Sequence, residues 1–249
     1  MSRGSILITG ASAGLGAEMA RQFAALGYDL ALCARRKDRL EALRDEILAA
    51  HPDRRVELAA LDVTDDAAVF EVVRGAAAGF GVLDRVIVNA GLGKGAPLGT
   101  GRYDANRETA MTNFVGALAT SEAAMEVFRR QGRGHLVMVS SMSALRGMRK
   151  SMTTYAASKA GVAALAEGLR SERVPGVEVS VVYPGYIRSE MNSHVEQATR
   201  FMVDTETGVR AMVAAIEKKS AKAYVPTWPW VPISYAMRLL PLGIVRRLS

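Results

Sequence analysis

The chain begins with a short apolar run, a glycine-rich turn and a stretch of helical spacing, and this order constrains its fold more than any other feature. Residues 5–9 are mostly apolar, the turn from Gly10 to Gly16 holds three glycines, and apolar residues recur at helical intervals over 17–26. The pattern predicts a strand, a tight turn and a helix. Such a helix points its first backbone N–H groups and its positive dipole end at the turn, where an anion such as a pyrophosphate can bind.

The same alternation of short apolar runs and helical stretches continues to about residue 226. The expected strands cover 5–9, 29–34, 56–61, 84–88, 134–140, 177–182 and 223–225, and the expected helices cover 17–26, 35–50, 65–78, 102–130, 153–173 and 205–219. Apolar strands separated by helices indicate an α/β fold, in which a parallel sheet is covered on both faces. No linker divides the chain, so we expect a single domain over 1–226 with a tail at 227–249.

Composition excludes several classes of protein. Of the 249 residues, 49% are apolar and 23% are charged, which is typical of a globular enzyme. The net charge is +7, but the Lys and Arg residues are scattered, so nucleic acid is not an expected partner. The single cysteine, Cys33, excludes an internal disulfide, and the N-terminus lacks the apolar stretch of a signal peptide. We therefore expect a cytoplasmic protein.

No metal site is expected. His51, His135 and His194 are scattered, and no Cys/His or Glu-x-x-His spacing suits zinc. The pair Asp65-Asp66 is better interpreted as the capping region of the following helix than as a set of ligands.

The glycine turn has two interpretations. In the first, Gly10, Ser12, Gly14, Leu15 and Gly16 form a dinucleotide-binding turn, although its T-G-x-x-x-G-x-G spacing differs from G-x-G-x-x-G. In the second, the stretch from Gly10 to Gly14 is the G-x-S-x-G elbow of a serine hydrolase, with Ser12 as nucleophile and His194 as its base. That fold requires an earlier strand for its oxyanion hole, and only eleven residues precede Ser12. We therefore favour the dinucleotide turn.

The end of the second expected strand predicts which dinucleotide binds. In folds of this kind a carboxylate at that position binds a ribose 2′-hydroxyl, whereas arginine accommodates a 2′-phosphate. The strand here ends in Arg35 and Arg36, and the first carboxylate is Asp38. Because guanidinium groups suit a phosphate dianion, the sequence predicts NADP(H) rather than NAD(H).

A phenol and an ammonium group lie four residues apart, at Tyr155 and Lys159, in a stretch with helical spacing. Residues at this interval share one face of a helix. At roughly 5 Å and an effective dielectric constant of about 20, the ammonium group favours the phenolate by about 3 kcal/mol, which would lower the pKa of Tyr155 from about 10 towards about 8. This makes Tyr155 a candidate general acid and base near neutral pH.

Together these motifs closely resemble the short-chain dehydrogenase/reductase family over roughly residues 5–190. The resemblance rests on the motifs Thr9-Gly10-x3-Gly14-x-Gly16, Leu61-Asp62-Val63-Thr64, Asn89-Ala90-Gly91, Asn113, Ser140-Ser141, Tyr155-x3-Lys159 and Pro184-Gly185-Tyr186-Ile187. It implies a Rossmann-type, doubly wound parallel sheet, usually of seven strands.

The resemblance also implies how the cofactor is held. Asp62 and Val63 would contact the adenine, and Asn89, Ala90 and Gly91 would line the cofactor cleft. Ile187, after Pro184 and Gly185, would lie against the nicotinamide carboxamide.

The implied reaction transfers a hydride between the nicotinamide and a carbonyl or alcohol carbon. Tyr155 gives or takes the proton on oxygen, and Lys159 holds the ribose and stabilises the phenolate. Ser141 polarises the carbonyl. Asn113, expected in the middle of a long helix, would hold a water that relays protons from Lys159.

One spacing departs from the family pattern. Ser141 lies fourteen positions before Tyr155, where about thirteen is usual, so Ser140 and Ser143 are weaker alternatives. Ser141 is preferred because it follows the apolar run at 136–139 and would lie just beyond a strand's carboxyl end, where ligands bind in open α/β sheets.

A different class of function is a sensor that binds NADP(H) without turning anything over. The presence of both Tyr155 and Lys159 disfavours it, because a sensor needs no proton donor. For an enzyme, the expected substrate is a small-molecule carbonyl or alcohol, with its specificity set by the segments 92–101, 142–154 and 186–203. A bulky apolar ketone or alcohol would suit the methionines of these segments. These are Met142, Met148, Met152, Met191 and Met202. They could equally pack the core.

Two further expectations concern partners. Small residues such as Ala117, Ala124 and Ala164 line the helices 102–130 and 153–173, which pair across a two-fold axis in the family, so we expect a homodimer or homotetramer. The tail at 227–249 should form two short apolar segments divided by Pro241, too short to span a bilayer. It either contacts a membrane surface peripherally or packs over the substrate cleft or a neighbouring subunit.

Overall fold

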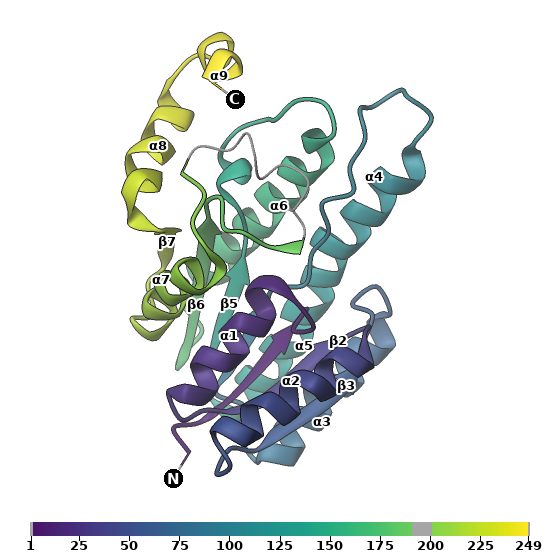
Figure 1. Ribbon diagram of the computed structural model, residues 1–249, viewed down its shortest axis with the longest axis vertical. Helices are drawn as coiled ribbons and strands as arrows, with labels where there is room; N and C mark the ends of the chain where they lie inside the picture. The colour runs from purple at the N-terminus through teal and green to yellow at the C-terminus, as the bar shows by residue number, and fades with distance from the viewer. Residues whose placement is uncertain (1, 191–200, 249) are drawn as a thin grey trace.

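The computed structural model describes residues 2–190 and 201–248, and Met191 and His194 lie outside these ranges. Over the described residues the strands form a single parallel sheet in the order β3-β2-β1-β4-β5-β6-β7 (Figure 1). The strands are β1 Ser5–Thr9, β2 Asp29–Ala34, β3 Val56–Ala60, β4 Arg85–Val88, β5 Gly134–Val139, β6 Val177–Pro184 and β7 Lys222–Val225. This confirms the expected seven-stranded Rossmann-type sheet.

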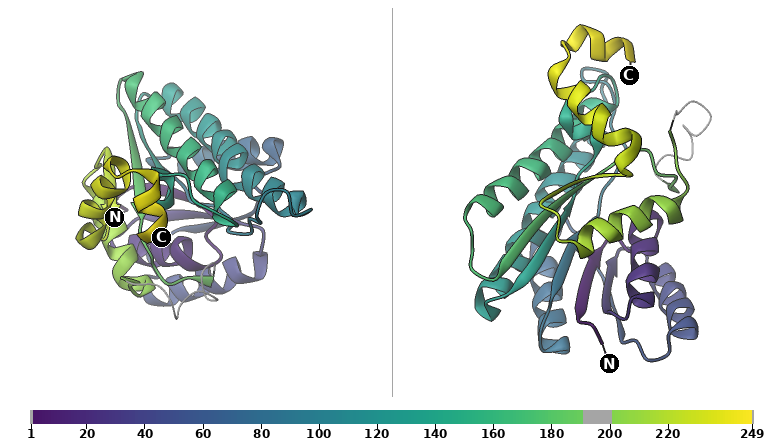
Figure 2. Two further views of the ribbon diagram at one scale, coloured as in Figure 1. Left: turned by 90° about the horizontal axis from the view of Figure 1, so that it is seen from above. Right: turned by 90° about the vertical axis from the view of Figure 1, so that its left-hand side faces the viewer.

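Helices cover both faces of the sheet, and each face has its own apolar core. Helices α1 (Gly14–Ala25), α2 (Lys37–Ala50) and α7 (Thr205–Glu217) pack on one face around Phe23 and Ile216. Helices α3 (Asp66–Phe80), α5 (Gly116–Gln131) and α6 (Met152–Ser171) pack on the other (Figure 2). Most strand residues are buried on both sides, which explains why the strands read as continuous apolar runs.

The expected long helix at 102–130 is interrupted, which corrects the sequence interpretation. It consists of α4 (Tyr103–Ala110), the π-helical turn η1 (Met111–Val115) and α5. Asn113 therefore lies in a π-helical turn, a feature that often marks functional sites. At α3 the capping prediction is confirmed, because the Asp65 carboxylate accepts a hydrogen bond from the N–H of Ala68 at 3.1 Å.

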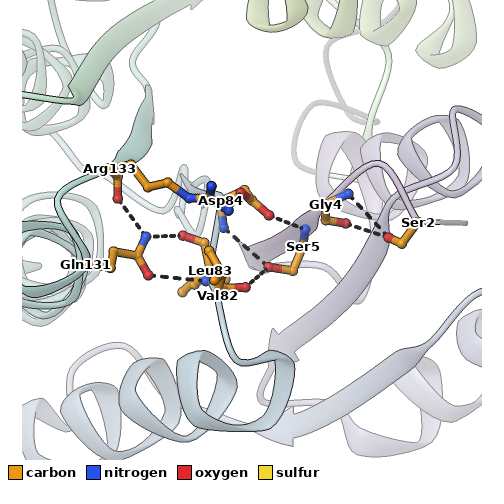
Figure 3. Close-up of polar contacts among 8 residues, drawn as sticks. All are labelled: Ser2, Gly4, Ser5, Val82, Leu83, Asp84, Gln131 and Arg133. Atoms are coloured by element: carbon orange, nitrogen blue, oxygen red, sulfur yellow. Dashed lines mark hydrogen bonds and ion pairs between the residues drawn. The ribbon is translucent and has the colours of Figure 1, made fainter.

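Polar contacts close the amino edge of the sheet (Figure 3). Asp84, just before β4, accepts a hydrogen bond from the N–H of Ser5 at 2.9 Å and pairs with Arg133 at 3.1 Å. Gln131 donates to the Leu83 carbonyl at 2.7 Å. In open α/β sheets ligands bind outside the carboxyl ends of the strands at the point where the strand order reverses, which here lies beyond β1 and β4.

The tail forms two helices, α8 (Thr227–Leu239) and α9 (Leu242–Leu248), on either side of Pro241 as expected. Figures 1 and 2 show both beyond the carboxyl edge of the sheet. Trp230 of α8 is buried in the core, whereas Trp228 and Leu239 are 76% and 80% exposed. No helix within residues 2–190 and 201–248 is long and apolar enough to cross a membrane.

Of the alanines named for subunit contact, those of α5 do not form an exposed face, whereas Ala164 of α6 is exposed. Ala117 and Ala124 are buried within the chain, because this side of α5 packs on the sheet. The exposed apolar side chains of this region are Phe114 and Leu118. Any contact between subunits through η1 and α5 would therefore use these larger side chains.

Candidate active site

A cleft of about 500 Å³ opens at the carboxyl edge of the sheet, above the point where the strand order reverses. Nearly all the residues selected from the sequence line it: Gly10, Ser12, Gly14, Leu15, Arg35, Arg36, Asp62, Val63, Asn89, Ala90, Gly91, Ser141, Tyr155, Lys159, Pro184, Gly185 and Ile187. Gly16 and Asn113 do not line it. Both lie directly behind residues that do.

The glycine turn between β1 and α1 is shaped by two close approaches. Gly10 has φ +70°, and a Cβ there would lie 2.8 Å from the Ala90 Cα. A Cβ on Gly16 would lie 2.3 Å from the Gly10 carbonyl oxygen, so Gly16 allows the helix to start against the turn. Ala13, which precedes α1, has no polar side chain to cap the helix, and its first N–H groups are therefore suited to an anionic ligand.

Thr9 and Asn89 fix the turn to the end of β4. The Thr9 hydroxyl accepts hydrogen bonds from the N–H groups of Asn89 at 3.1 Å and Ala90 at 3.2 Å. The Asn89 amide in turn donates to the Thr9 carbonyl at 3.0 Å. Asn89 thus contributes to the cleft mainly as a brace for the glycine turn.

Ser141 and Tyr155 meet through their side chains in the cleft. Ser141 ends the connection from β5, and its hydroxyl accepts a hydrogen bond from the N–H of Ser143 at 3.2 Å. Burial raises the pKa of Tyr155, and the hydrogen bond with Ser141 offsets part of this rise. By contrast, the Ser140 hydroxyl donates to the Lys159 carbonyl at 2.8 Å. This hydrogen bond joins α6 to the end of β5.

Lys159 is 4% exposed, and its ammonium group donates to the Val139 carbonyl at 2.8 Å. Burial lowers the pKa of Lys159 to about 8. The expectation that Lys159 brings the pKa of Tyr155 below its ordinary value is wrong for this structure. The burial that the sequence could not show dominates, and the ammonium group is directed at Val139.

Asn113 is fully buried and closes the loop that follows β4. Its amide oxygen accepts from the Leu92 N–H at 2.6 Å, and its amide nitrogen donates to the Leu92 carbonyl at 2.9 Å and to the Ser158 hydroxyl at 3.3 Å. Both amide hydrogens are therefore used. A water held by Asn113 would bind to the remaining lone pair of its side chain or to its backbone carbonyl, and the relay stays a prediction.

The arginines after β2 lie at the other end of the cleft. Arg36 donates to the Ser12 hydroxyl at 3.2 Å, and Arg35 lies 3.8 Å from the Asp62 carboxylate. Hydrogen bonds from Thr64 hold the pKa of Asp62 below its usual range, with Arg35 as a lesser cause. The Ser12 hydroxyl accepts a hydrogen bond from an arginine, which is unlike a hydrolase nucleophile that donates to a base. The expected base, His194, lies outside the described residues.

Sequence reasoning missed two sets of contacts made by residues next to the cleft. Tyr186 stands beside Trp230 of α8, with ring centroids 5.5 Å apart, at the Pro184-Gly185 turn. A Cβ on Gly185 would lie 2.0 Å from the Trp230 ring. Arg39, one helical turn beyond Arg36, and Glu190 form ion pairs at the arginine end. In the sequence, only the aromatic and apolar composition of the tail indicated that Trp230 would pack against the rest of the chain. No sequence feature indicated the contacts of Glu190.

Cleft and fold together match what a nucleotide cofactor requires. N–H donors stand at the start of α1, and arginines stand at the opposite end of the cleft. A parallel sheet with these groups at its switch point defines a dinucleotide-binding protein. No cluster of three or more His, Cys, Asp or Glu within the described ranges could hold a metal ion.

Comparison with known proteins gives the family. A model of the short chain dehydrogenase family matches residues 5–200. An uncharacterized oxidoreductase of Mycobacterium tuberculosis is 49% identical over 250 residues, covering 100% of this chain and 98% of the relative. The chain belongs to the short-chain dehydrogenase/reductase family of oxidoreductases.

Solved structures agree on the fold. A short chain dehydrogenase from Burkholderia cenocepacia in complex with NADP is similar with a TM-score of 0.83 and 26% identity, covering 99% of this chain and 98% of that one. One from Burkholderia phymatum in complex with NAD has a TM-score of 0.86 and 21% identity, covering 99% and 95%. Because the two hold different dinucleotides, the similarity of fold alone does not select the cofactor.

Proposed function

We propose that this protein is an NADP(H)-dependent oxidoreductase that interconverts a carbonyl and an alcohol, with Tyr155 as the general acid and base. The observation that best supports it is the meeting of Ser141, Tyr155 and Lys159 in the same cleft as the glycine turn. These three side chains would place a hydroxyl donor, a proton donor and a cation at one end of a dinucleotide site.

The bound cofactor would supply or accept the hydride, and the protein's own residues would manage the oxygen. Ser141 would hydrogen-bond the substrate oxygen where negative charge develops. Tyr155, already hydrogen-bonded to Ser141, would deliver or remove the proton. Lys159 would orient the cofactor ribose. Asn113 would set the Leu92 loop and a proton relay behind Lys159.

The preference for NADP(H) is argued from the end of β2. This strand ends at Ala34, and the next two residues are Arg35 and Arg36, which line the cleft together with Ser12. The residues that end β2 offer a ribose 2′-hydroxyl no carboxylate of their own, whereas a 2′-phosphate would find a guanidinium and the Ser12 hydroxyl there. In the nucleotide, Asp62 and Val63 would contact the adenine.

The other residues of the cleft would complete the site. Gly10, Gly14 and Leu15 would face the pyrophosphate, with Gly16 packed behind them. The middle of the cofactor would lie against Asn89, Ala90 and Gly91. Its nicotinamide end would contact Pro184, Gly185 and Ile187. Every one of these except Gly16 lines the cleft.

The proposed substrate is a bulky apolar ketone or alcohol. Of the methionines that suggested this, Met142 is buried in the core, and Met148, Met152 and Met202 are partly buried. The Tyr186 ring, packed against the buried Trp230, adds apolar surface beside Pro184-Gly185. Cellular location is proposed as cytoplasmic.

Assembly is proposed as a homodimer or homotetramer, with the exposed Phe114 and Leu118 as candidate contacts. The tail at 227–249 either contributes a wall of the site or contacts a membrane peripherally. Its buried Trp230 favours the first, and its exposed Trp228 and Leu239 keep the second open. The division at residue 226 stays a prediction.

The test is NADPH consumption with a homologous series of 2-ketones. Wild type is expected to turn over the longer ketones with the higher kcat/KM. A kcat/KM that does not change with chain length would remove the apolar pocket. Tyr155→Phe should bind NADPH as wild type does and lose turnover. A wild type inactive on a broad panel of carbonyls and alcohols would favour the sensor.

The cofactor assignment has its own test. Arg35→Ala and Arg36→Ala together should raise the KM for NADPH far more than that for NADH. Exchanging the exposed Arg74 of α3 for Ala removes the same kind of side chain away from the cleft and serves as the control. Equal effects on both cofactors would contradict the assignment.

A further inference from the structure

A carboxylate of the protein's own chain lies at the arginine end of the cleft. Glu190 forms an ion pair with Arg36 at 3.2 Å and a second ion pair with Arg39. It follows β6 in the chain, whereas both arginines flank the start of α2, so the contact joins segments about 150 positions apart. Glu190 thus ties the segment after β6 to the start of α2.

This carboxylate uses the groups that the cofactor would use. Glu190, Arg36 and Ser12 all line the same cleft, and Arg36 contacts the other two at once. A carboxylate and a phosphate each offer a guanidinium group two oxygen acceptors in its plane. Glu190 therefore stands where the anionic group of a ligand would be received.

Both ion pairs of Glu190 are partly exposed to solvent, so a more highly charged anion can displace the carboxylate. The side chains of Arg36, Arg39 and Glu190 are 43%, 46% and 57% exposed, so water and salt screen both pairs. Arg39 first and Arg36 second hold the pKa of Glu190 below its usual range, so the carboxylate is charged near neutral pH. A phosphate dianion carries nearly twice its charge and more acceptors.

We propose that Glu190 is a built-in competitor for the 2′-phosphate of the cofactor, and that Arg39 is a further cation to which this phosphate binds once Glu190 is displaced. The proposal rests on the proposed use of NADP(H). When NADPH binds, Arg36 and Arg39 must release Glu190 and pair with the 2′-phosphate instead. NADH has no phosphate at this position, so it cannot replace Glu190. Glu190 therefore weakens the binding of NADPH and leaves that of NADH nearly unchanged.

The test measures dissociation constants of NADPH and NADH by nucleotide fluorescence for wild type, Glu190→Gln and Arg39→Gln. Glu190→Gln should bind NADPH about three- to tenfold more tightly, as expected from two exposed ion pairs, and NADH within about twofold of wild type. Arg39→Gln should weaken NADPH and not NADH. The fragment 2′,5′-ADP should follow NADPH, and 5′-AMP should follow NADH.

A matched control separates local competition from overall charge. Glu172→Gln removes a carboxylate that pairs with Arg129 at the far end of α6, and it changes net charge by the same amount. NADPH affinity in this variant should equal that of wild type. Glu190→Gln with wild-type affinity for NADPH, or with equal tightening of NADH, overturns the competitor role. Unchanged NADPH affinity in Arg39→Gln overturns the role of Arg39.

Failure of the cofactor assignment would look different. If wild type binds NADH and NADPH equally and Arg36→Gln changes neither, the site does not receive a 2′-phosphate and the proposed cofactor is wrong. If Arg36→Gln weakens NADPH while Glu190→Gln leaves it unchanged, the cofactor stands and the competitor is refuted.

Discussion

Lys159 is buried in the core of the candidate site, and replacing it with methionine should make the protein more stable while abolishing its activity. The ammonium group is 4% exposed and has a backbone carbonyl, that of Val139, as its hydrogen-bond acceptor. A charge held this way costs folding free energy. Methionine has a similar length and no charge, so it removes the cost and fills the same space.

The expected gain in the free energy of unfolding follows from the pKa of Lys159. Burial lowers the pKa of Lys159 from 10.5 to about 8, and a shift of this size corresponds to about 3 kcal/mol against folding at neutral pH. The variant loses the hydrogen bond to Val139, which costs about 1 kcal/mol. Lys159→Met should therefore gain about 2 kcal/mol at pH 7, or about 4–8 °C in Tm for a chain of this length.

The gain should depend on pH in a defined direction. Below pH 8 the native lysine is protonated and the full cost is present. Between pH 8 and 10.5 the folded state binds fewer protons than the unfolded state, so wild type becomes more stable as pH rises. By pH 9.5 wild type should have recovered about 2 kcal/mol relative to the variant.

Urea unfolding at pH 7 and pH 9.5 measures both quantities. Lys218→Met, at the exposed end of α7, is the control and should show neither the gain nor its pH dependence. A Lys159→Met protein less stable than wild type at pH 7, or a difference that does not shrink by pH 9.5, would refute the reasoning.

Three further changes test other parts of the structure. Gly185→Ala places a methyl group 2.0 Å from the Trp230 ring, so α8 must shift, and stability should fall by about 1–3 kcal/mol in urea with a raised substrate KM; unchanged values would show that α8 does not press on this turn. Glu217→Gln removes the charge paired at 2.7 Å with the buried Arg85 and should cost about 2 kcal/mol, and a loss below about 0.5 kcal/mol would contradict this role. Truncation after Val225 should alter KM or the sedimentation coefficient if the tail packs on the site or a subunit, whereas loss of anionic-liposome binding alone would support the membrane contact.

The strands and the site motifs could be predicted because each depends on nearby residues. A doubly buried strand must be apolar along its length, as 5–9 and 134–139 are, and the glycine turn needs small residues at fixed intervals. The π-helical turn that interrupts the expected helix at Asn113 was missed because its residues have ordinary helical spacing. The interruption coincides with the hydrogen bonds that Asn113 makes with Leu92, twenty-one positions away.

Burial and long-range contacts explain the other differences between the sequence-based predictions and the structure. The interval between Tyr155 and Lys159 predicted a shared helix face, but the sequence could not show that Lys159 is enclosed and turned towards Val139. Likewise Arg36 was correctly expected at the cleft, while its pairing with Glu190 depends on a loop whose course the sequence does not define. Local spacing thus predicted which groups gather, and the folded chain determines their charge and partners.

The central claim is that Tyr155 and a nicotinamide cofactor together reduce a carbonyl, and transfer of deuterium tests it most directly. Wild type, supplied with a reactive ketone and NADPH carrying deuterium at both positions of the reactive nicotinamide carbon, should give an alcohol with one deuterium on its carbinol carbon. Tyr155→Phe should retain NADPH binding and form product at least about 100-fold more slowly. NADPH binding without any labelled alcohol from wild type would contradict the account.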